Sequence, residues 1–338
     1  MACLDTCSLE PDAERALFRF VLRLLVLFAL AMCVTEASAQ DTYPSKPIKL
    51  VIPYPPGQAD ALARVIGERL SGILGQPVLV DNRPGAGGNI ASRLVASAAP
   101  DGYTLLVTGN HHNLNPRIYK DAGYDSRRSF VPVIQLTEGP AVLLTQPGSP
   151  FKSLQDLVQA AKARPGQIAY ASAGIGSSVH IVTELFMASA QIELLHVPYK
   201  GSGPAIQDAL GGRVPLVMAS LGGALPFLKS GQLRALVNTA NARWPALPDV
   251  PTFAELGYPE ATLVLWMGIM APAGTPAPRV DRLNREIHSI LSEPAVRSRI
   301  FELALVPVGG PPEHFAKMLQ ADYNAVEGIV ARTGMAAE

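Results

Sequence analysis

The sequence has very little cysteine, and what it has lies near one end. The three cysteines of the 338-residue chain are Cys3, Cys7 and Cys33. Residues beyond position 39 therefore form no disulfide and offer neither a thiol nucleophile nor a cysteine-ligated metal site. That part of the chain has to fold on its apolar core alone, and its length suffices for one or two domains of ordinary size.

The chain also lacks an excess of either charge, with 28 basic and 28 acidic residues. Residues 1–39 hold three arginines and five acidic residues, so 25 basic and 23 acidic residues lie beyond them. Nucleic acids and anionic membrane surfaces are bound by strongly basic faces. The near-neutral balance argues against both as partners.

The N-terminal residues have the pattern of a secretory signal peptide. An apolar run, Leu24 to Val34, ends before the small residues Ala37-Ser38-Ala39, and three arginines precede it, Arg15, Arg19 and Arg23. At about eleven residues the run is shorter than the roughly 20 that span a bilayer. We predict that residues 1–39 are removed before Gln40. Cys33 stands in a weak lipobox-like context, and lipidation is not expected because Met32 occupies the small-residue position.

Residues 48–109 alternate between strand-like and helix-like patterns with short connections. The apolar runs IKLVIPY, PVLVDN and YTLLVTG predict strands, and PPGQAD and RPGAGG lead into two amphipathic segments between them. Asp60 and Arg64 have helical i, i+4 spacing, which predicts a surface ion pair. The β-α-β-α-β order predicts a parallel, doubly wound sheet with a ligand crevice at the carboxyl ends of its strands.

A second α/β series begins after a predicted loop rich in His, Asn and Pro, which follows the YTLLVTG strand. It opens with the run AVLLTQ and continues to LRALVNTA, and LVLWMGIMAP at residues 263–272 predicts a strand that returns to the first series. Thr275 is predicted to cap a helix that Pro276 opens, and residues 312–332 to form another helix. We therefore predict two domains, residues 44–142 plus 266–338 and residues 143–265, joined by a two-strand hinge.

The stretch YASAGIGSSVHIVTELF, residues 170–186, predicts a strand, a glycine turn and a helix. Ser177 or Ser178 is placed to cap the helix. Free N–H groups and the helix dipole favour an anion at such a start, and Gly174 and Gly176 permit close approach to the backbone. An ordinary capped helix that binds nothing is the alternative, since most helix starts are of that kind.

Two other motifs have simpler interpretations. RPGAGGNI lacks the Lys-Ser or Lys-Thr of a P-loop, and no third glycine follows Gly85 and Gly87 or Gly174 and Gly176 in the dinucleotide-binding register, so no nucleotide cofactor is expected. His111 and His112 are adjacent, so their side chains diverge, and no cysteine or nearby acid completes a metal site. No metal is expected.

Several polar residues are candidates for the ligand cleft, each with a structural alternative. Asn110 and His111 either line the cleft or lie on an exposed loop; His180 either contacts the ligand or braces its turn. Tyr199 either closes over the ligand or packs in the core, Ser220 is a weaker candidate, and Trp266 is more simply part of the hinge core.

The sequence resembles the Bug-type (TctC-like) periplasmic solute receptors of tripartite tricarboxylate transporters over nearly all of the chain beyond residue 39. The resemblance rests on the motifs YPSKPIKLVIPYPPG, DNRPGAGGNIASRLVASAAPDGYTLL, ASAGIGSSVH, VPYKGSGPAIQDALGG, LPDVPTFAELGYP and WMGIMAPAGTP. It implies an α/β fold of the two-domain periplasmic binding protein (Venus flytrap) type, each domain a mainly parallel sheet flanked by helices.

The resemblance also implies a ligand and a site. In the family a carboxylate is held by backbone amides and waters at two β-to-α loops. Carried over to this sequence, those loops hold Pro56, Gly57, Gln58 and Asp60 in one domain and Ser172, Gly174, Gly176, Ser177 and His180 in the other. The family usually reads PPGG, two residues and then Asp, whereas this chain reads PPGQAD, so the first loop is one residue shorter.

The function implied is that of a monomeric periplasmic receptor that captures a small carboxylate and delivers it to membrane transporter subunits. A ligand-loaded sensor for a membrane histidine kinase uses the same binding chemistry and is an alternative. A hydrolase or lyase is a weaker one, because Ser177 is not in a G-x-S-x-G elbow and no carboxylate is apparent to orient His180.

Overall fold

The computed structural model describes residues 19–23 and 43–334. The predicted cleavage site before Gln40 and all three cysteines lie outside the described residues. Residues 19–23 are helical. The described residues from Lys46 onward form a compact unit, which contains both β-sheets.

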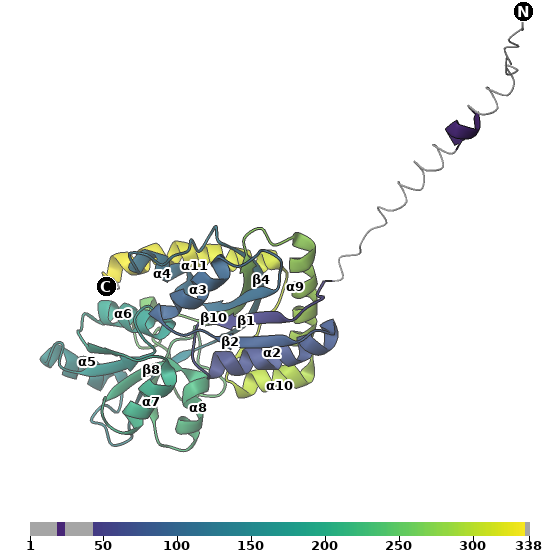
Figure 1. The fold of residues 1–338 in the computed structure, drawn as a ribbon. Coiled ribbons are helices and arrows are strands. Elements are labelled where there is room, and N and C mark those ends of the chain that lie inside the picture. Colours follow the sequence, from purple (N-terminus) through teal and green to yellow (C-terminus); the bar gives the residue numbers. More distant parts are fainter. Residues whose placement is uncertain (1–18, 24–42, 335–338) are drawn as a thin grey trace, which may run out of the picture. The chain divides into compact units, whose positions relative to one another are not determined.

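The unit contains a six-stranded sheet in the order β11-β4-β10-β3-β1-β2. The strands are β1 (Ile48–Ile52), β2 (Val78–Asn82), β3 (Thr104–Gly109), β4 (Phe130–Gly139), β10 (Leu265–Pro272) and β11 (Val306–Pro307). In Figure 1, helices α3 (Asn89–Ala96), α4 (His111–Ile118) and α11 (Pro312–Thr333) lie on one side of this sheet. Helices α2 (Gln58–Leu74), α9 (Ala277–Ser292) and α10 (Pro294–Glu302) cover the other. We call this part the first lobe.

A five-stranded sheet in the order β7-β6-β8-β5-β9 forms the second lobe. Its strands are β5 (Ala141–Thr145), β6 (Ala169–Ser172), β7 (Leu195–Pro198), β8 (Leu216–Ser220) and β9 (Arg234–Asn238). Helices α5 (Leu154–Ala163) and α6 (Ser178–Ala190) pack on one face, and α7 (Ser202–Leu210) and α8 (Leu221–Lys229) on the other. Short 3₁₀ turns, η2 (Ala86–Gly88) and η3 (Pro259–Ala261), complete the unit.

The continuous apolar run of β5 reflects a strand buried on both faces. Ala141 and Leu143 belong to the core beneath α5 and α6, whereas Val142 and Leu144 belong to the core beneath α7 and α8. Side chains alternate between the two faces of a strand, so a strand covered by helices on both sides needs apolar residues at successive positions.

In both sheets most strands run in the same direction, as predicted, and the parallel pairs are β1 with β2 and β3, and β6 with β7 and β8. In the six-stranded sheet β10 and the short edge strand β11 run in the opposite direction, and in the five-stranded sheet β5 does, so their pairs with neighbouring strands are antiparallel. The chain passes from β4 of the first lobe to β5 of the second through Pro140, and returns to the first lobe at β10. We propose lobe boundaries at these two crossings, close to those predicted from the sequence.

The C-terminal helix α11 contacts both lobes. Phe315, in its first turn, is buried against the first sheet with Trp266, whereas Val326 and Ile329 belong to the core of the second lobe. Figure 1 shows α11 running above the first sheet toward α6. The lobes are therefore joined by packing as well as by the two chain crossings.

The prediction of a loop directly after the YTLLVTG strand is wrong, because residues 111–118 form helix α4. Pro116 lies inside the helix, where it lacks the N–H that would bond to the carbonyl of His112. The Tyr124 hydroxyl donates to that carbonyl instead, at 3.1 Å. This side-chain contact thus replaces the missing helical bond, and the local sequence pattern of the helix does not reveal it.

Other local differences concern helix starts and one strand. Thr275 does not cap α9: Pro276 is the N-cap residue, and the Thr275 hydroxyl donates to the carbonyl of Pro272. Helix α7 begins at Ser202, and strand β4 and helix α10 were not predicted. The sequence of β4 holds Pro132 and polar residues in the middle of its length, which weakens the strand pattern.

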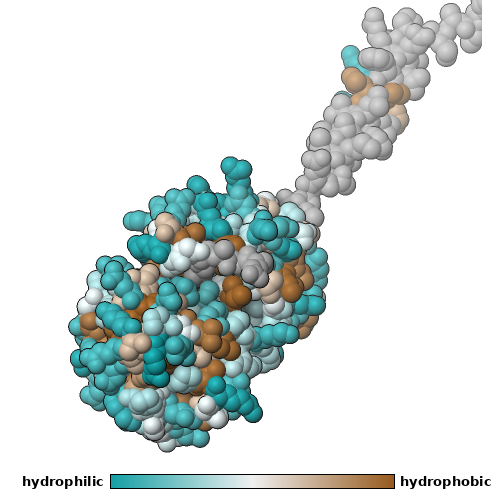
Figure 2. Space-filling view, turned by 90° about the vertical axis from the view of Figure 1, so that its left-hand side faces the viewer, coloured by the Kyte–Doolittle hydropathy of each residue, from teal (hydrophilic) through white to brown (hydrophobic). Residues whose placement is uncertain are grey.

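The face of the molecule seen in Figure 2 is mostly hydrophilic, with hydrophobic residues in small groups. Among the described helices, none combines the length and apolar character that a bilayer crossing needs.

Candidate functional site

A cavity of about 380 Å³ lies between the two lobes. The first lobe lines it with residues 54–59, Gly109, residues 265–267 and Leu305. The second lobe lines it with the start of α6, the segment 201–207 and the start of α8. Its size is within the range of sites for small organic ligands.

Four helices present their first turns to this cavity. Its lining includes residues at the start of each helix: Gly57 and Gln58 of α2, Ser177 and Ser178 of α6, Gly201 and Ser202 of α7, and Ser220 and Gly223 of α8. The first N–H groups of a helix have no carbonyl partner within it, and the helix dipole places partial positive charge there. The cavity wall is therefore rich in groups that favour an anion.

The start of α6 shows how one such wall is built. Ser177 is the N-cap residue: its hydroxyl accepts the N–H of His180 and donates to the carbonyl of Gly174, at 3.3 and 2.7 Å. The first backbone bond of the helix runs from Ile181 to the Ser177 carbonyl. The N–H groups of Ser178 and Val179 precede that bond, so the helix cannot satisfy them.

Gly174 and Gly176 shape this turn and do not line the cavity. The N–H of Gly174 donates to the Ser172 hydroxyl at 3.1 Å, and the N–H of Gly176 donates to Nδ1 of His180 at 3.2 Å. Gly174 has φ 118°, and a Cβ there would lie 2.8 Å from the carbonyl of Tyr199. Glycine is thus required by the backbone conformation and by the approach of a neighbouring strand end.

The start of α2 faces that of α6 from the other lobe. Pro56, Gly57 and Gln58 line the cavity, and the Gln58 side-chain amide donates to the carbonyl of Leu303 at 2.7 Å. Asp60 does not line it: its carboxylate pairs with Arg64 at 2.9 Å, the ion pair predicted from their spacing.

The contributions of α7 and α8 include a segment that sequence reasoning missed. Ser220 lines the cavity as the N-cap residue of α8, and its side chain makes no capping bond in the structure. Gly201, Ser202 and Gly203 were not singled out. The sequence Gly-Ser-Gly-Pro directly after a predicted strand indicates a helix start here, because proline is favoured in the first turn of a helix.

The rest of the cavity wall is apolar. Its large side chains are Val179, Ile206, Phe227, Leu265, Trp266, Met267 and Leu305. Trp266, expected in the hinge core, is nearly fully buried and also lines the cavity. Among the residues that the structure describes, no Lys, Arg, His, Asp or Glu lines the cavity. A bound anion would therefore meet backbone amides and hydroxyls, with no charged side chain beside it.

Tyr54 lines the cavity and was missed by sequence reasoning, whereas His111 lies behind it. The Tyr54 hydroxyl and His111 Nδ1 are 2.7 Å apart, and Thr108 Oγ1 is 3.4 Å from Nε2. Burial, and to a lesser degree the charge of His112, lowers the pKa of His111 to about 3. A neutral imidazole therefore supports Tyr54 from inside the first lobe.

The remaining candidates make structural contacts. Asn110 accepts the N–H of Trp266 and donates to the Val264 carbonyl, which secures the start of β10. The Tyr199 hydroxyl donates to Asp208 at 2.7 Å, and Tyr199 does not line the cavity. Ser172 and His180 lie beneath the Gly174–Ser177 turn, also outside the lining.

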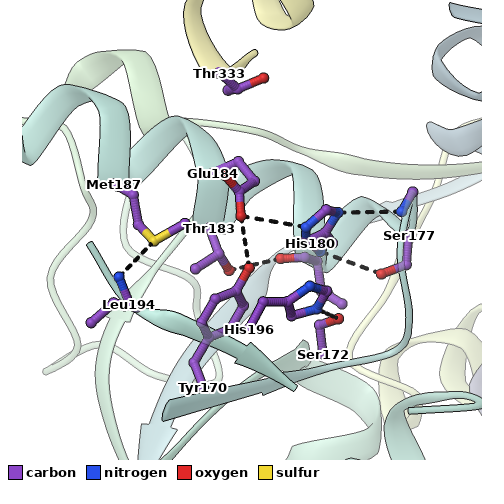
Figure 3. A network of polar contacts seen from close by, with 12 residues as sticks. Tyr170, Ser172, Ser177, His180, Thr183, Glu184, Met187, Leu194, His196 and Thr333 are labelled. Carbon is purple, nitrogen blue, oxygen red and sulfur yellow. Dashed lines mark hydrogen bonds and ion pairs between the residues drawn. The ribbon is translucent and has the colours of Figure 1, made fainter. Parts of the chain in front are cut away.

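His180 has a carboxylate partner that was not foreseen. Its Nε2 lies 3.4 Å from Oε1 of Glu184, one helical turn later, and the Tyr170 hydroxyl donates to the same oxygen at 3.0 Å. Figure 3 shows the His180 ring between Glu184 and the turn that holds Ser177. The His180 ring nitrogens are thus engaged by Gly176 and Glu184, and neither bonds to the Ser177 hydroxyl. Nowhere in residues 19–23 and 43–334 do three His, Cys, Asp or Glu side chains gather as metal ligands.

The two lobes and the cavity between them define a two-domain periplasmic binding protein fold. The chain is 31% identical to the periplasmic binding protein BugD, with a TM-score of 0.82 over 88% of this chain and 100% of that one. It is 35% identical to an R. palustris protein whose structure was solved with adipate, with a TM-score of 0.83 over 87% of this chain and 99% of that one.

The sequence match is specific to one family. Residues 62–335 match the model of the tripartite tricarboxylate transporter family receptor, TctC. A protein of Pseudomonas sp. (strain P51), encoded in the tcbD-tcbE intergenic region, is 41% identical over 89% of this chain and 90% of its own length. The chain belongs to the TctC receptor family, as the motifs of the sequence indicated.

Proposed function

We propose that this protein is an extracytoplasmic receptor that captures a small carboxylate in the cavity between its lobes and delivers it to a membrane transporter. The observation that carries the proposal is the convergence of four helix starts on a cavity whose lining, in residues 43–334, includes no charged side chain. Family membership supports the delivery step, since the family is named for receptors of tripartite transporters.

Backbone amides alone offer enough binding free energy for this role. Hydrogen bonds to charged groups contribute roughly 1.5–3 kcal/mol each, and a micromolar ligand needs about 8 kcal/mol net. The N–H groups of Ser178 and Val179 and those at the start of α2 are the proposed donors, with the Ser178 and Ser202 hydroxyls beside them. Reversible capture therefore requires no arginine.

The composition of the wall favours acids with an apolar body. Besides the helix starts, the cavity is lined by apolar side chains, which include Trp266, Phe227 and Leu305. Each additional carboxylate would have to be desolvated against apolar atoms, which costs free energy unless hydrogen bonds replace its water. We therefore propose a monocarboxylate or a dicarboxylate with a hydrocarbon middle, and adipate, bound by one similar structure, is the first probe.

The contacts of Ser177 favour binding over catalysis. Its hydroxyl donates to the Gly174 carbonyl, and the His180 ring nitrogens are directed to Gly176 and Glu184. A serine nucleophile needs a base that accepts its proton. No such base faces Ser177 in the described part of the chain, which supports a receptor that returns its ligand unchanged.

The proposal is tested by incubating purified protein with adipate, malate, benzoate and citrate and following both thermal unfolding and product formation. We expect adipate or benzoate to raise the melting temperature at millimolar concentration, with the acid recovered intact. Mass spectrometry of ligand that co-purifies extends the panel. Turnover of any of these acids would overturn the receptor function.

A further inference from the structure

A buried polar cluster lies behind the first turn of α6 and has no part in lining the cavity. Its members are Tyr170, Ser172, His180, Glu184 and His196 (Figure 3). His180 and Ser172 are almost fully buried, and the His180 and His196 rings stack with centroids 4.2 Å apart. Glu184 and His196 also border a second pocket on the outer side of α6.

The hydrogen bonds of this cluster fix the protonation state of His180. The N–H of Gly176 donates to Nδ1, and a backbone N–H can only donate. Nδ1 therefore carries no proton. The neutral ring then has its hydrogen on Nε2, which lies 3.4 Å from the Glu184 carboxylate. Glu184 in turn is held by the Tyr170 hydroxyl.

His180 is connected to the cavity through the turn that precedes α6. Its ring holds Gly176, and its backbone N–H donates to the hydroxyl of Ser177. Ser177 and the next two residues line the cavity. The direction of the Ser178 and Val179 N–H groups thus depends on a turn that the His180 ring secures from behind.

Building on the proposed function, we propose that His180 and Glu184 are positioning residues that hold the start of α6 in its ligand-binding geometry, and that they do so only while His180 is neutral. A proton on Nδ1 would face the Gly176 N–H, so two donors would point at each other. The turn would have to move, and ligand affinity would fall in acid.

The groups around His180 come from three elements and from the outer pocket. Glu184 lies on its own helix, His196 comes from β7, and Tyr170 comes from β6 through its bond to Glu184. Lys162, Glu193 and Arg332 border the outer pocket beside Glu184 and His196. Burial, followed by the charge of His180, lowers the pKa of His196 to about 4. Replacing each histidine in turn distinguishes the effect of one from the effect of the other.

The first test needs no ligand. In ¹⁵N NMR of the purified protein at pH 8, His180 should be the tautomer with its hydrogen on Nε2. On acidification, the Gly176 amide resonance should change together with the His180 ring resonances, because the Gly176 N–H donates to Nδ1. A protonated Nδ1 at pH 8, or a Gly176 resonance that does not follow His180, would overturn the proposal.

The second test measures adipate affinity by calorimetry between pH 8 and pH 6, a range in which the carboxyl groups of adipate stay largely ionised. His180→Ala leaves the Gly176 N–H without a partner and should weaken binding at least tenfold at pH 8. His180→Gln can accept from Gly176 and donate to Glu184 but cannot titrate. It should restore most of that loss and remove the acid dependence seen in the wild type.

Two controls assign the effect to His180. Glu193→Gln removes a nearby charge that does not contact the ring and should leave the pH profile of affinity unchanged. His196→Gln should retain the acid dependence. An acid dependence lost in His196→Gln but kept in His180→Gln would overturn the assignment. If adipate does not bind, the proposed ligand class fails while the NMR result still decides the positioning role.

Discussion

At the scale of single residues, Gly174 and Gly176 shape the turn before α6. In the structure their N–H groups are bonded to Ser172 and His180, and the cavity is lined by the residues that come after them in the chain. Sequence reasoning located the turn correctly, but which amides face inward depends on side chains from β6 and α6.

Replacing Gly174 by valine should impair both stability and binding. Its φ of 118° disfavours any side chain, and a Cβ would lie 2.8 Å from the Tyr199 carbonyl. We expect a loss of about 1–3 kcal/mol in the free energy of urea unfolding and at least tenfold weaker adipate binding.

The matched control is Gly72→Ala. Gly72 lies within α2, and apart from its chain neighbours and the backbone of its own helix no described atom would lie within 4 Å of an added Cβ. This change should stabilise the protein by up to about 1 kcal/mol without affecting affinity. Unchanged adipate affinity in Gly174→Val would contradict the proposed role of the turn.

Comparing two serine N-caps separates an effect on helix stability from an effect on ligand binding. Ser177 caps α6 at the cavity, and Ser153 caps α5 outside it, where it forms a capping box with Asp156. Either serine replaced by alanine should cost about 1 kcal/mol of unfolding free energy. Only Ser177→Ala should weaken adipate binding in calorimetry, and equal affinities for the two variants would argue against a functional role of the α6 start.

At the scale of elements, the strand and helix alternation could be predicted and the tertiary exceptions could not. The parallel core of each sheet follows from apolar runs and glycine turns. Helix α4 was not expected because its first turn is polar and Pro116 lies in its interior, where the carbonyl of His112 accepts from Tyr124, a residue beyond the end of the helix. Likewise, two of the four helix starts at the cavity were clear from glycine-rich turns, whereas that of α7 follows a weaker signal.

The electrostatic role of these helix starts is tested by adding a negative charge to one of them. Ser220→Asp places a carboxylate at the N-cap of α8 in the cavity wall. Aspartate is a good N-cap residue, so thermal stability should be maintained. Adipate binding should weaken at least tenfold by like-charge repulsion in a poorly screened site.

The corresponding change at α5, Ser153→Asp, provides the comparison. It carries the same charge at a helix start outside the cavity, so adipate affinity should stay within about twofold of the wild type because the distance and solvent screen the added charge. Equal effects of the two substitutions would show that net charge, and not the cavity wall, governs binding.

At the scale of the whole molecule, neutral buried histidines make the fold sensitive to acid. Burial lowers the pKa of His111 to about 3 and, opposed in part by a bond to the Ser126 carbonyl, that of His112 to about 4. The unfolded chain takes up these protons near pH 6.5. Unfolding therefore binds protons as the pH falls from about 6.5 to 4, and stability is lost over that range.

Urea unfolding at pH 7 and pH 4.5 measures this loss. Each of these two histidines should account for about 2–3 kcal/mol at pH 4.5. His112→Gln should reduce the difference between the two pH values, whatever its effect on stability at pH 7. Wild type and variant losing the same free energy between pH 7 and 4.5 would rule out His112 as a source.

The central claim is that a carboxylate binds between the lobes at the helix starts. The most direct measurement is ¹⁵N amide NMR during titration with the acid of the panel that stabilises the protein most. We predict the largest shifts at Ser178, Val179, Gln58 and Ala59, from both lobes together. Largest shifts confined to one lobe or to the outer pocket beside Glu184, or no binding of any carboxylate, would contradict the claim.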